Sequence, residues 1–355
     1  MKKGKVSNLD QFFAESIGRK VWVGVDVHKR SYSVAVFRDD GVMVSWKTAA
    51  DNDALMMQLV VHGMEIKALV YESGPTGFGL ARTCHNVGIP AIVAAPSKIN
   101  RPVSPTAKTD SLDCRKLAEL AAKDMVRSIA IPSEEEEALR ALQRRRHQLA
   151  DGRRKVRQRI RGFLLFHGLQ EPTGLDNWTN AAVAALVNMP INTVLREVLD
   201  DYLEELECLK EKIARLESVL AKHTAALHQR RLACLQSVPG VGRIVACSFL
   251  SELFRPERFQ RGEEVAAYLG LAPIVRHSGE KTPTGFLRPT GHTRLRSLLV
   301  EAAWIWKGRD SGVQEFYARM LRNTGLAQKA ITAVARKLSI ILWRLACEVR
   351  AYRSA

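Results

Sequence analysis

The chain has 355 residues, a hydrophobic content of 46% and a formal net charge of +17. This hydrophobic content excludes a disordered protein, and the length allows two or three domains with cores of their own. The charge excess predicts a polyanionic partner, and nucleic acid is favoured over a membrane surface because no apolar run approaches the roughly 18 residues of a spanning helix.

The basic N-terminus has no apolar signal core behind it, so we expect a cytoplasmic, nucleoid-associated protein without membrane contacts. The six cysteines are scattered and form no Cys-x-x-Cys pair. This pattern predicts reduced, mostly buried thiols rather than disulfides or a zinc site.

The first third of the chain predicts an α/β domain over residues 21–132, after a flexible N-terminus at 1–20. Short apolar runs at 22–27, 31–37 and 42–46 predict three strands of an antiparallel meander. Buried strands at 68–71 and 91–95 then alternate with helical patterns at 51–64 and 77–87. A meander followed by such an alternation predicts a mixed sheet with helices on its faces.

Four acidic residues of this domain are candidate metal ligands. Asp26 interrupts an apolar strand and Glu72 ends another, where an unpaired buried carboxylate would be costly. Asp110 and Asp113 are three residues apart, on one face of a helix that begins near Thr109. Ligands collect at the carboxyl ends of strands in open sheets, so the four acids could meet there around Mg²⁺ or Mn²⁺. The alternative is four ordinary solvated acids.

Basic residues follow in a loop and in a long helix. Residues 97–108 form an extended basic loop, suited to a phosphate backbone or to a plain surface. A helix with a capping-box start at Ser133 then carries many arginines with no matching Glu or Asp, so we expect a partner outside the chain to relieve their repulsion, which favours nucleic acid over a solvated face. The candidate nucleic-acid contacts in these two segments are Lys98, Arg101, Lys108, Arg144, Arg145, Arg146, Arg153, Arg154 and Arg157.

A second long amphipathic helix is predicted over 194–227. Its apolar stripe can pair with the preceding helix as a hairpin or recruit a second subunit, and the sequence leaves both open. We expect these helices to form a coiled-coil insertion over residues 133–228.

The last predicted domain spans residues 229–355. Its turn at 235–242 resembles a helix-hairpin-helix turn, in which Gly240 and Gly242 would let backbone N–H groups reach a phosphate; a plain tight turn is the alternative. Ser278 precedes a glycine in a loop that also carries Arg276, Lys281 and Arg288. Cations there would assist a serine nucleophile, although Ser-Gly pairs are common in loops. Apolar helices are predicted from 297 to 350.

Five motifs in this order resemble a known family. They are Gly24-Val25-Asp26-Val27-His28-Lys29, Tyr71-Glu72-Ser73-Gly74, Lys108-Thr109-Asp110-Ser111-Leu112-Asp113, Pro239-Gly240-Val241-Gly242, and Gly270-Leu271-Ala272-Pro273 followed by Ser278-Gly279. Over nearly the whole chain the sequence is similar to the DEDD transposases of insertion sequences, relatives of Piv-type DNA invertases.

The resemblance implies a RuvC-like (RNase H-like) domain whose acidic tetrad Asp26, Glu72, Asp110 and Asp113 binds Mg²⁺ (or Mn²⁺), a coiled-coil insertion, and a C-terminal transposase domain. It implies that Ser278 forms a covalent 5′-phosphoserine link to double-stranded DNA. It also implies homodimers that pair into tetramers, and a non-coding bridge RNA that selects donor and target DNA.

Two segments depart from the family pattern. They are Ser73-Gly74-Pro75-Thr76-Gly77 after the second acid and Arg288-Pro289-Thr290-Gly291 after the serine. Neither changes an expected catalytic residue, so they affect substrate contacts more than catalysis.

The predicted function is therefore DNA strand cleavage and exchange by a transposase. Three alternatives remain open at this point. They are a RuvC-like junction endonuclease that uses water as nucleophile, a site-specific DNA invertase, and a non-catalytic scaffold that binds nucleic acid.

Overall fold

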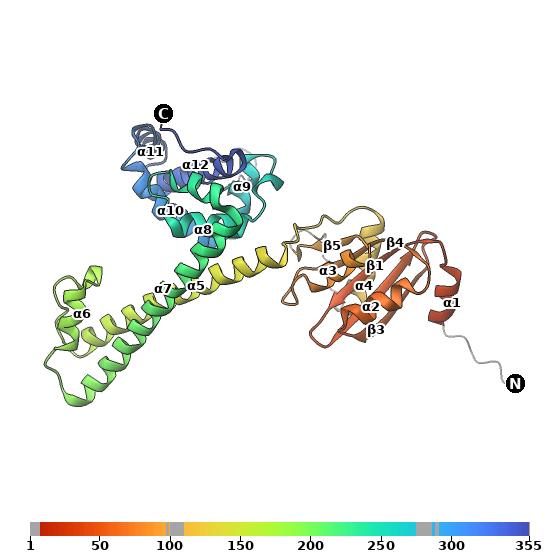
Figure 1. The fold of residues 1–355 in the computed structure, drawn as a ribbon, viewed down its shortest axis with the longest axis horizontal. Coiled ribbons are helices and arrows are strands. Elements are labelled where there is room, and N and C mark those ends of the chain that lie inside the picture. Colours follow the sequence, from red (N-terminus) through yellow and green to blue (C-terminus); the bar gives the residue numbers. More distant parts are fainter. Residues whose placement is uncertain (1–7, 97–98, 100–109, 275–285, 288–290, 355) are drawn as a thin grey trace, which may run out of the picture. The chain divides into compact units, whose positions relative to one another are not determined.

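The structure is a computed structural model that describes residues 8–96, 99, 110–274, 286–287 and 291–354. The chain divides into two compact units, Met1–Ser133 and Glu134–Ala355. Figure 1 shows the elements of each unit.

The first unit is built on a five-stranded mixed sheet. Its strands are β1 (Lys20–Val27), β2 (Ser31–Arg38), β3 (Met43–Ala49), β4 (Glu65–Glu72) and β5 (Ala91–Ala94), in the order β3-β2-β1-β4-β5. The meander β1-β2-β3 is antiparallel, whereas β4 runs parallel to β1 and β5 parallel to β4. The predicted mixed sheet is confirmed.

Helices cover both faces of this sheet. One face packs with α2 (Asn52–Val60) and α3 (Gly79–Asn86) around a core that contains Val23, Val25 and Tyr71. The other face packs with α4 (Asp110–Ala122), and its smaller core contains Val70, Ala94 and Leu117. The alternation of side chains along β1 and β4 separates the two cores.

The N-terminus differs from the prediction of a flexible segment over residues 1–20. Residues Asn8–Glu15 form the helix α1, and Phe12 and Phe13 are buried in the core of the sheet. Arg38 reinforces this docking, since its guanidinium lies over the Phe12 ring and donates to the Ser16 hydroxyl at 3.3 Å. Two adjacent buried aromatic rings outweigh the polar composition of the segment.

The second unit begins with two long helices, α5 (Glu134–Phe166) and α7 (Thr193–Gln236), which pack along each other (Figure 1). Buried Val156, Ile160, Leu199 and Leu206 form part of their shared core. The apolar stripe of the second helix is therefore used for a hairpin within the chain. Between them lie the short helices η2 (Leu175–Asn177) and α6 (Asn180–Val187).

The helix α7 is longer than predicted and crosses the boundary expected at residues 228 and 229. It is kinked there, because His228 has non-helical backbone angles (φ −142°, ψ 34°). The predicted boundary thus falls at a change of direction within one helix rather than at a loop.

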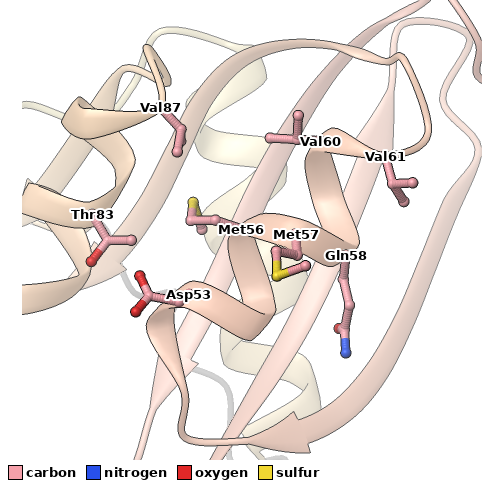
Figure 2. Close-up of a pocket in the computed structure, with 8 residues that line it drawn as sticks. All are labelled: Asp53, Met56, Met57, Gln58, Val60, Val61, Thr83 and Val87. Carbon is pink, nitrogen blue, oxygen red and sulfur yellow. The ribbon is translucent and has the colours of Figure 1, made fainter.

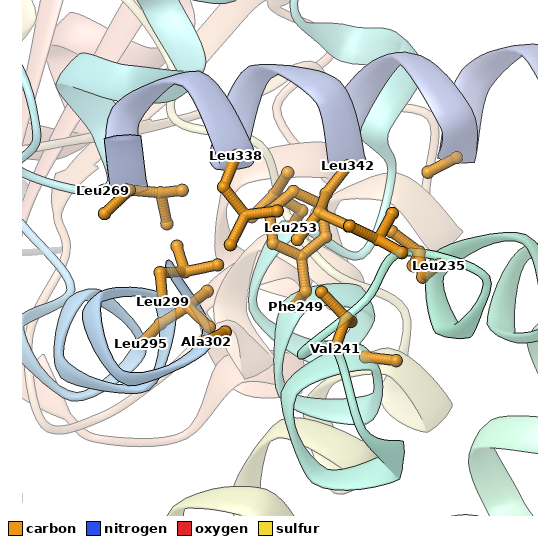
Figure 3. Close-up of a cluster of buried hydrophobic side chains, with 14 of the residues drawn as sticks. Leu235, Val241, Phe249, Leu253, Leu269, Leu295, Leu299, Ala302, Leu338 and Leu342 are labelled. Carbon is orange, nitrogen blue, oxygen red and sulfur yellow. The ribbon is translucent and has the colours of Figure 1, made fainter. Parts of the chain in front are cut away.

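The rest of the second unit is helical. It comprises α8 (Arg243–Leu253), η3 (Pro256–Arg258), α9 (Gly262–Tyr268), α10 (Thr293–Lys307), α11 (Ser311–Thr324) and α12 (Ala327–Glu348), with a two-stranded ribbon β6 (Pro273–Ile274) and β7 (Phe286–Leu287). Figure 3 shows their common core, where Phe249, Leu299 and Leu342 meet from three helices. The predicted apolar C-terminal helices are confirmed. Among the helices in the described residues, none combines the length and apolarity that crossing a membrane requires.

Candidate active site in the first unit

Asp26 and Glu72 lie next to each other at the carboxyl ends of parallel strands. Val25 pairs with Tyr71, so the following residue of each strand occupies the next position of the same register. Because Val25 and Tyr71 point into the core under α2 and α3, Asp26 and Glu72 face the other side of the sheet, which α4 covers. Neighbouring strands are about 4.8 Å apart, which brings the two carboxylates within range of a shared cation.

Gly24 is the residue that lets α4 approach this edge of the sheet. A Cβ atom at Gly24 would lie 2.0 Å from the carbonyl oxygen of Cys114 and 2.7 Å from the amide nitrogen of Ala118. Both atoms belong to the α4 backbone, so any other residue would push the helix off β1. Gly24 and Asp26 are two positions apart and share a face, so this contact also fixes α4 beside Asp26.

The first turn of α4 carries Asp110 and Asp113, directly before Cys114. Burial raises the pKa of the Cys114 thiol to about 11, and the charge of Asp26 contributes to this shift. Asp26 therefore lies close to the residue that follows Asp113. Three of the four predicted acids come from three elements that pack together, and the backbone of the fourth, Asp110, opens the same helix.

The side chain of Asp110 lies outside the described residues. Among the side chains that are described, no three His, Cys, Asp or Glu residues lie close enough to hold a metal ion. Asp26, Glu72 and Asp113 thus come from neighbouring elements, while the complete tetrad stays a prediction.

His28 is a further candidate site residue, beyond the four acids expected from the sequence. Its Nε2 atom lies 3.1 Å from Oδ2 of Asp26, and the Asp26 side chain is 24% exposed. Asp26 belongs to the last two residues of β1 and His28 follows the strand directly, so an extended backbone places their side chains, two positions apart, on one face. This spacing could have identified the pair from the sequence.

A cleft of about 660 Å³ lies between α2 and α3 on the opposite face of the sheet, as Figure 2 shows. Its walls are mostly apolar and include Met57, Val60 and Val61, with Asp53 as the one acid among the lining residues. Because phosphodiester chemistry needs cations or several carboxylates at one place, this cleft does not compete with the acidic edge as a candidate site.

Several predicted site residues lie outside the described part of the chain. They are Ser278, Arg276, Lys281, Arg288, Lys98, Arg101 and Lys108.

The Val238-Pro239-Gly240-Val241-Gly242 turn joins α7 to α8 and packs against α10. A Cβ atom at Gly240 (φ +86°) would lie 2.6 Å from the carbonyl oxygen of Ala302, whereas one at Gly242 would meet nothing within 4 Å. Gly240 thus has a packing reason of its own, and phosphate binding by the turn stays a prediction.

The expectation that the arginines of α5 lack matching acids is wrong. Arg146 forms a salt bridge with Glu217 of α7. Arg144 forms a bidentate salt bridge with Glu252 of α8, with both hydrogen bonds at 2.9 Å. Arg154 pairs with Asp151 at 2.6 Å. Glu217 and Glu252 are distant in sequence, so the pattern of α5 alone could not match them, whereas Asp151 lies on α5 itself, three residues before Arg154.

A basic cleft nevertheless remains between α5 and α10. It has a volume of about 560 Å³, and Arg153, Arg157 and His147 line it from α5, opposite Ser297 and Glu301 of α10. Burial lowers the pKa of His147, and the positive charges of Arg294 and Arg146 lower it further. Arg145 is exposed on α5, where it bonds to Gln148 at 3.3 Å.

Sequence comparisons place both units among transposases. Residues 23–168 match the profile of the DEDD transposases of the IS110 type, described as "Transposase", and residues 232–318 match "Transposase IS116/IS110/IS902 family". The first match contains all four predicted acids, and the second contains Ser278.

Individual relatives are similar over most of their length. The "Putative transposase y4qE" of Sinorhizobium fredii is 30% identical over 94% of this chain and 90% of its own. The transposase for insertion sequence element IS1533 of Leptospira borgpetersenii is 26% identical over 91% and 95% of the two chains. That for IS1111A of Coxiella burnetii is 26% identical over 77% and 75%.

Proposed function

Because the chain belongs to the IS110/IS116/IS902 family of insertion-sequence transposases, it is a DNA transposase, and we propose that its acidic edge and Ser278 together cleave and rejoin DNA strands. The observation that carries this proposal is the contact of α4 with β1 at Gly24. It brings the helix that opens with Asp110 and Asp113 to the strand end where Asp26 and Glu72 are neighbours.

The donor set suits a hard divalent cation. Asp26, Glu72, Asp110 and Asp113 would hold Mg²⁺ or Mn²⁺ through carboxylate oxygens, the ligands these ions prefer. The bound ion supplies charge neutralisation at the phosphate that reacts. His28, whose Nε2 lies 3.1 Å from Asp26 Oδ2, would hold that carboxylate in place beside the ion.

The serine step conserves bonds. The Oγ atom of Ser278 attacks the scissile phosphorus, the bond to the 3′ oxygen breaks, and that oxygen leaves as a hydroxyl with the proton that the serine lost. A 3′ hydroxyl of the partner strand then attacks the same phosphorus and releases the serine. One phosphoester bond forms for each that breaks, so the exchange needs neither water nor a nucleoside triphosphate.

The nucleic-acid surface that we propose combines two parts. In the described residues it is the basic cleft between α5 and α10, together with the exposed Arg145 of α5. To it we add Lys98, Arg101, Lys108, Arg276, Lys281 and Arg288 and the turn of Gly240 and Gly242, all predicted from the sequence.

Assembly and guidance are proposed from the family resemblance. Double-stranded donor and target DNA would be aligned by a bridge RNA on a tetramer formed from two homodimers. One subunit's serine would then serve another subunit's acids.

A suicide DNA substrate tests the proposal. Its cleaved 3′ strand is short enough to dissociate, so the covalent intermediate accumulates. With Mg²⁺ the wild-type protein should yield a protein–DNA adduct, Ser278→Ala should yield none, and Asp26→Asn should lower the yield by at least about 10²-fold.

Other outcomes distinguish the alternatives. Cleaved DNA without an adduct would indicate a water-using RuvC-like endonuclease. Inverted rather than inserted products would indicate an invertase. Cellular activity that survives both substitutions would leave only a nucleic-acid scaffold.

A further inference from the structure

Glu252 of α8 is a buried acid that the proposed chemistry does not use. The residue is 4% exposed, and its carboxylate accepts one hydrogen bond each from Nε and Nη2 of Arg144 at 2.9 Å. Arg140 Nε approaches it at 3.6 Å and His292 Nδ1 at 3.4 Å. Burial alone would raise the pKa of Glu252, but Arg144, His292 and Arg140 offset this effect and lower it.

The residues around Glu252 flank the segment that carries Ser278. His292 lies directly before α10, and its ring contacts that of Tyr268, with 4.6 Å between the ring centres. The Tyr268 hydroxyl donates to the backbone oxygen of Glu252 at 3.2 Å. Residues from both sides of the segment, one before it and one after it, therefore touch the same acid.

The two flanks also hold each other. A Cβ atom at Gly291 (φ +107°) would lie 2.7 Å from the amide nitrogen of Gly270, so the two glycine backbones are in contact. Arg296 donates to the Gly270 oxygen at 3.1 Å. The strands β6 and β7 pair between these two flanks, and we call the flanks and this ribbon the stem of the serine-bearing segment.

The cluster of charged side chains around Glu252 is not explained by its contribution to the free energy of unfolding. Arg140 is mostly buried, and its Nε and Nη2 atoms have no hydrogen-bond partner in the described part of the chain. Such a network stabilises the fold less than apolar packing would, but a bidentate arginine–carboxylate pair fixes the position and orientation of both side chains. We therefore attribute the cluster to the fixed placement of its side chains rather than to a gain in the free energy of unfolding.

We propose that Glu252 is a positioning residue: it ties both flanks of the serine-bearing segment, through His292 and Tyr268, to Arg144 of α5. This inference rests on the proposed role of Ser278 as the nucleophile. Fixed flanks place the hydroxyl for attack, and a displacement of about 1 Å can cost about 10²-fold in rate.

The test is Glu252→Gln in the full-length protein with the suicide substrate and Mg²⁺. At saturating DNA, the single-turnover rate of adduct formation should fall by about 10²-fold while the DNA dissociation constant changes by less than about twofold. Glu252→Asp keeps the charge and should recover part of the rate.

Asp310→Asn is the matched control. Asp310 is a similarly buried acid (5% exposed) in the same unit, bonded to the hydroxyls of Tyr352 and Ser354 at 2.6 and 2.9 Å rather than to the stem. It should lower Tm and leave the adduct rate unchanged, which separates positioning from stability.

Gly291→Ala provides an independent variant that distorts the stem without altering any charge, and it should show the same loss of rate. It decides the question if Glu252→Gln fails to fold. Wild-type adduct rates in folded Glu252→Gln or Gly291→Ala would overturn the inference, as would a loss explained by weaker DNA binding. An adduct that persists in Ser278→Ala, or its absence in the wild type, would instead overturn the proposed function.

Discussion

At the scale of single residues, Gly24 decides whether the acidic edge can assemble. It lies in the middle of β1, where glycine weakens a strand and usually marks a close approach of another backbone. Here that backbone is the first half of α4, at Cys114 and Ala118. Asp26 lies two positions further along the same strand and therefore faces the same helix.

Gly24→Ala should therefore displace α4 from β1. We expect a loss of about 1–3 kcal/mol in free energy of unfolding from overpacking, together with loss of Mg²⁺-dependent DNA cleavage. Chemical denaturation and a cleavage assay would measure the two effects. Gly162→Ala is the control, because a Cβ atom there meets nothing within 4 Å. Full cleavage activity in folded Gly24→Ala would contradict this account of the edge.

At the scale of elements, α1 shows how a short helix is fastened to the sheet. Arg38 at the end of β2 donates to both carboxylate oxygens of Asp40 at 3.0 Å and also reaches Ser16, just after α1. The hydrogen bond from Arg38 lowers the pKa of Asp40 to about 2. The helix, the strand and the turn are thus linked through one guanidinium.

The lowered pKa of Asp40 gives this link a pH dependence. A depressed carboxyl pKa contributes stability above the unfolded value of about 3.9 and loses it as the pH falls toward the folded value. Wild type should be more stable than Asp40→Asn at pH 7, and the difference should shrink between about pH 4 and pH 2. Urea titrations of both proteins across this range would measure it. A difference that stays constant down to pH 2 would argue against the link.

The turn between α7 and α8 offers a second test at this scale. Gly240→Ala should lower the free energy of unfolding by about 1–3 kcal/mol, because the new methyl group would meet the α10 backbone. Gly242→Ala should leave stability nearly unchanged, since that position is open. Thermal unfolding of both variants would decide. If Gly242→Ala weakens DNA binding without lowering Tm, the predicted phosphate contact gains support.

At the scale of the whole molecule, the net charge of +17 does not mean that the basic side chains are unpaired. Many arginines of α5 are neutralised by acids of α7, α8 and the intervening segment, such as Glu217, Glu252 and Glu171. Arg153 and Arg157, by contrast, line the cleft between α5 and α10. Net charge therefore indicates the kind of partner but not its place.

The salt dependence of DNA binding measures how many phosphates the basic cleft contacts. The double variant Arg153→Gln/Arg157→Gln should reduce the slope of log affinity against log salt by about 2, since each lost phosphate contact removes about 0.9. Arg161→Gln is the control, because Arg161 is paired with Glu171 and Asp176. Equal slopes for both variants would place the DNA elsewhere.

The sequence by itself determined the element types and the identity of the candidate acids. Strand and helix periodicity predicted the mixed sheet, and an acid within one apolar strand and another at the end of a second strand made Asp26 and Glu72 candidates. These signals are local, because they depend on which faces of one strand or helix are buried. The same locality explains the error at α1, where two buried phenylalanines outweigh a polar composition.

Only the tertiary structure decided which residues meet. Gly24 acquired its role from the backbone of α4, ninety residues further along the chain. The arginines of α5 acquired partners from other helices, and Glu252 acquired its place between the two flanks of the serine segment. Such pairings depend on packing between distant segments, a quantity that no local pattern in the sequence contains.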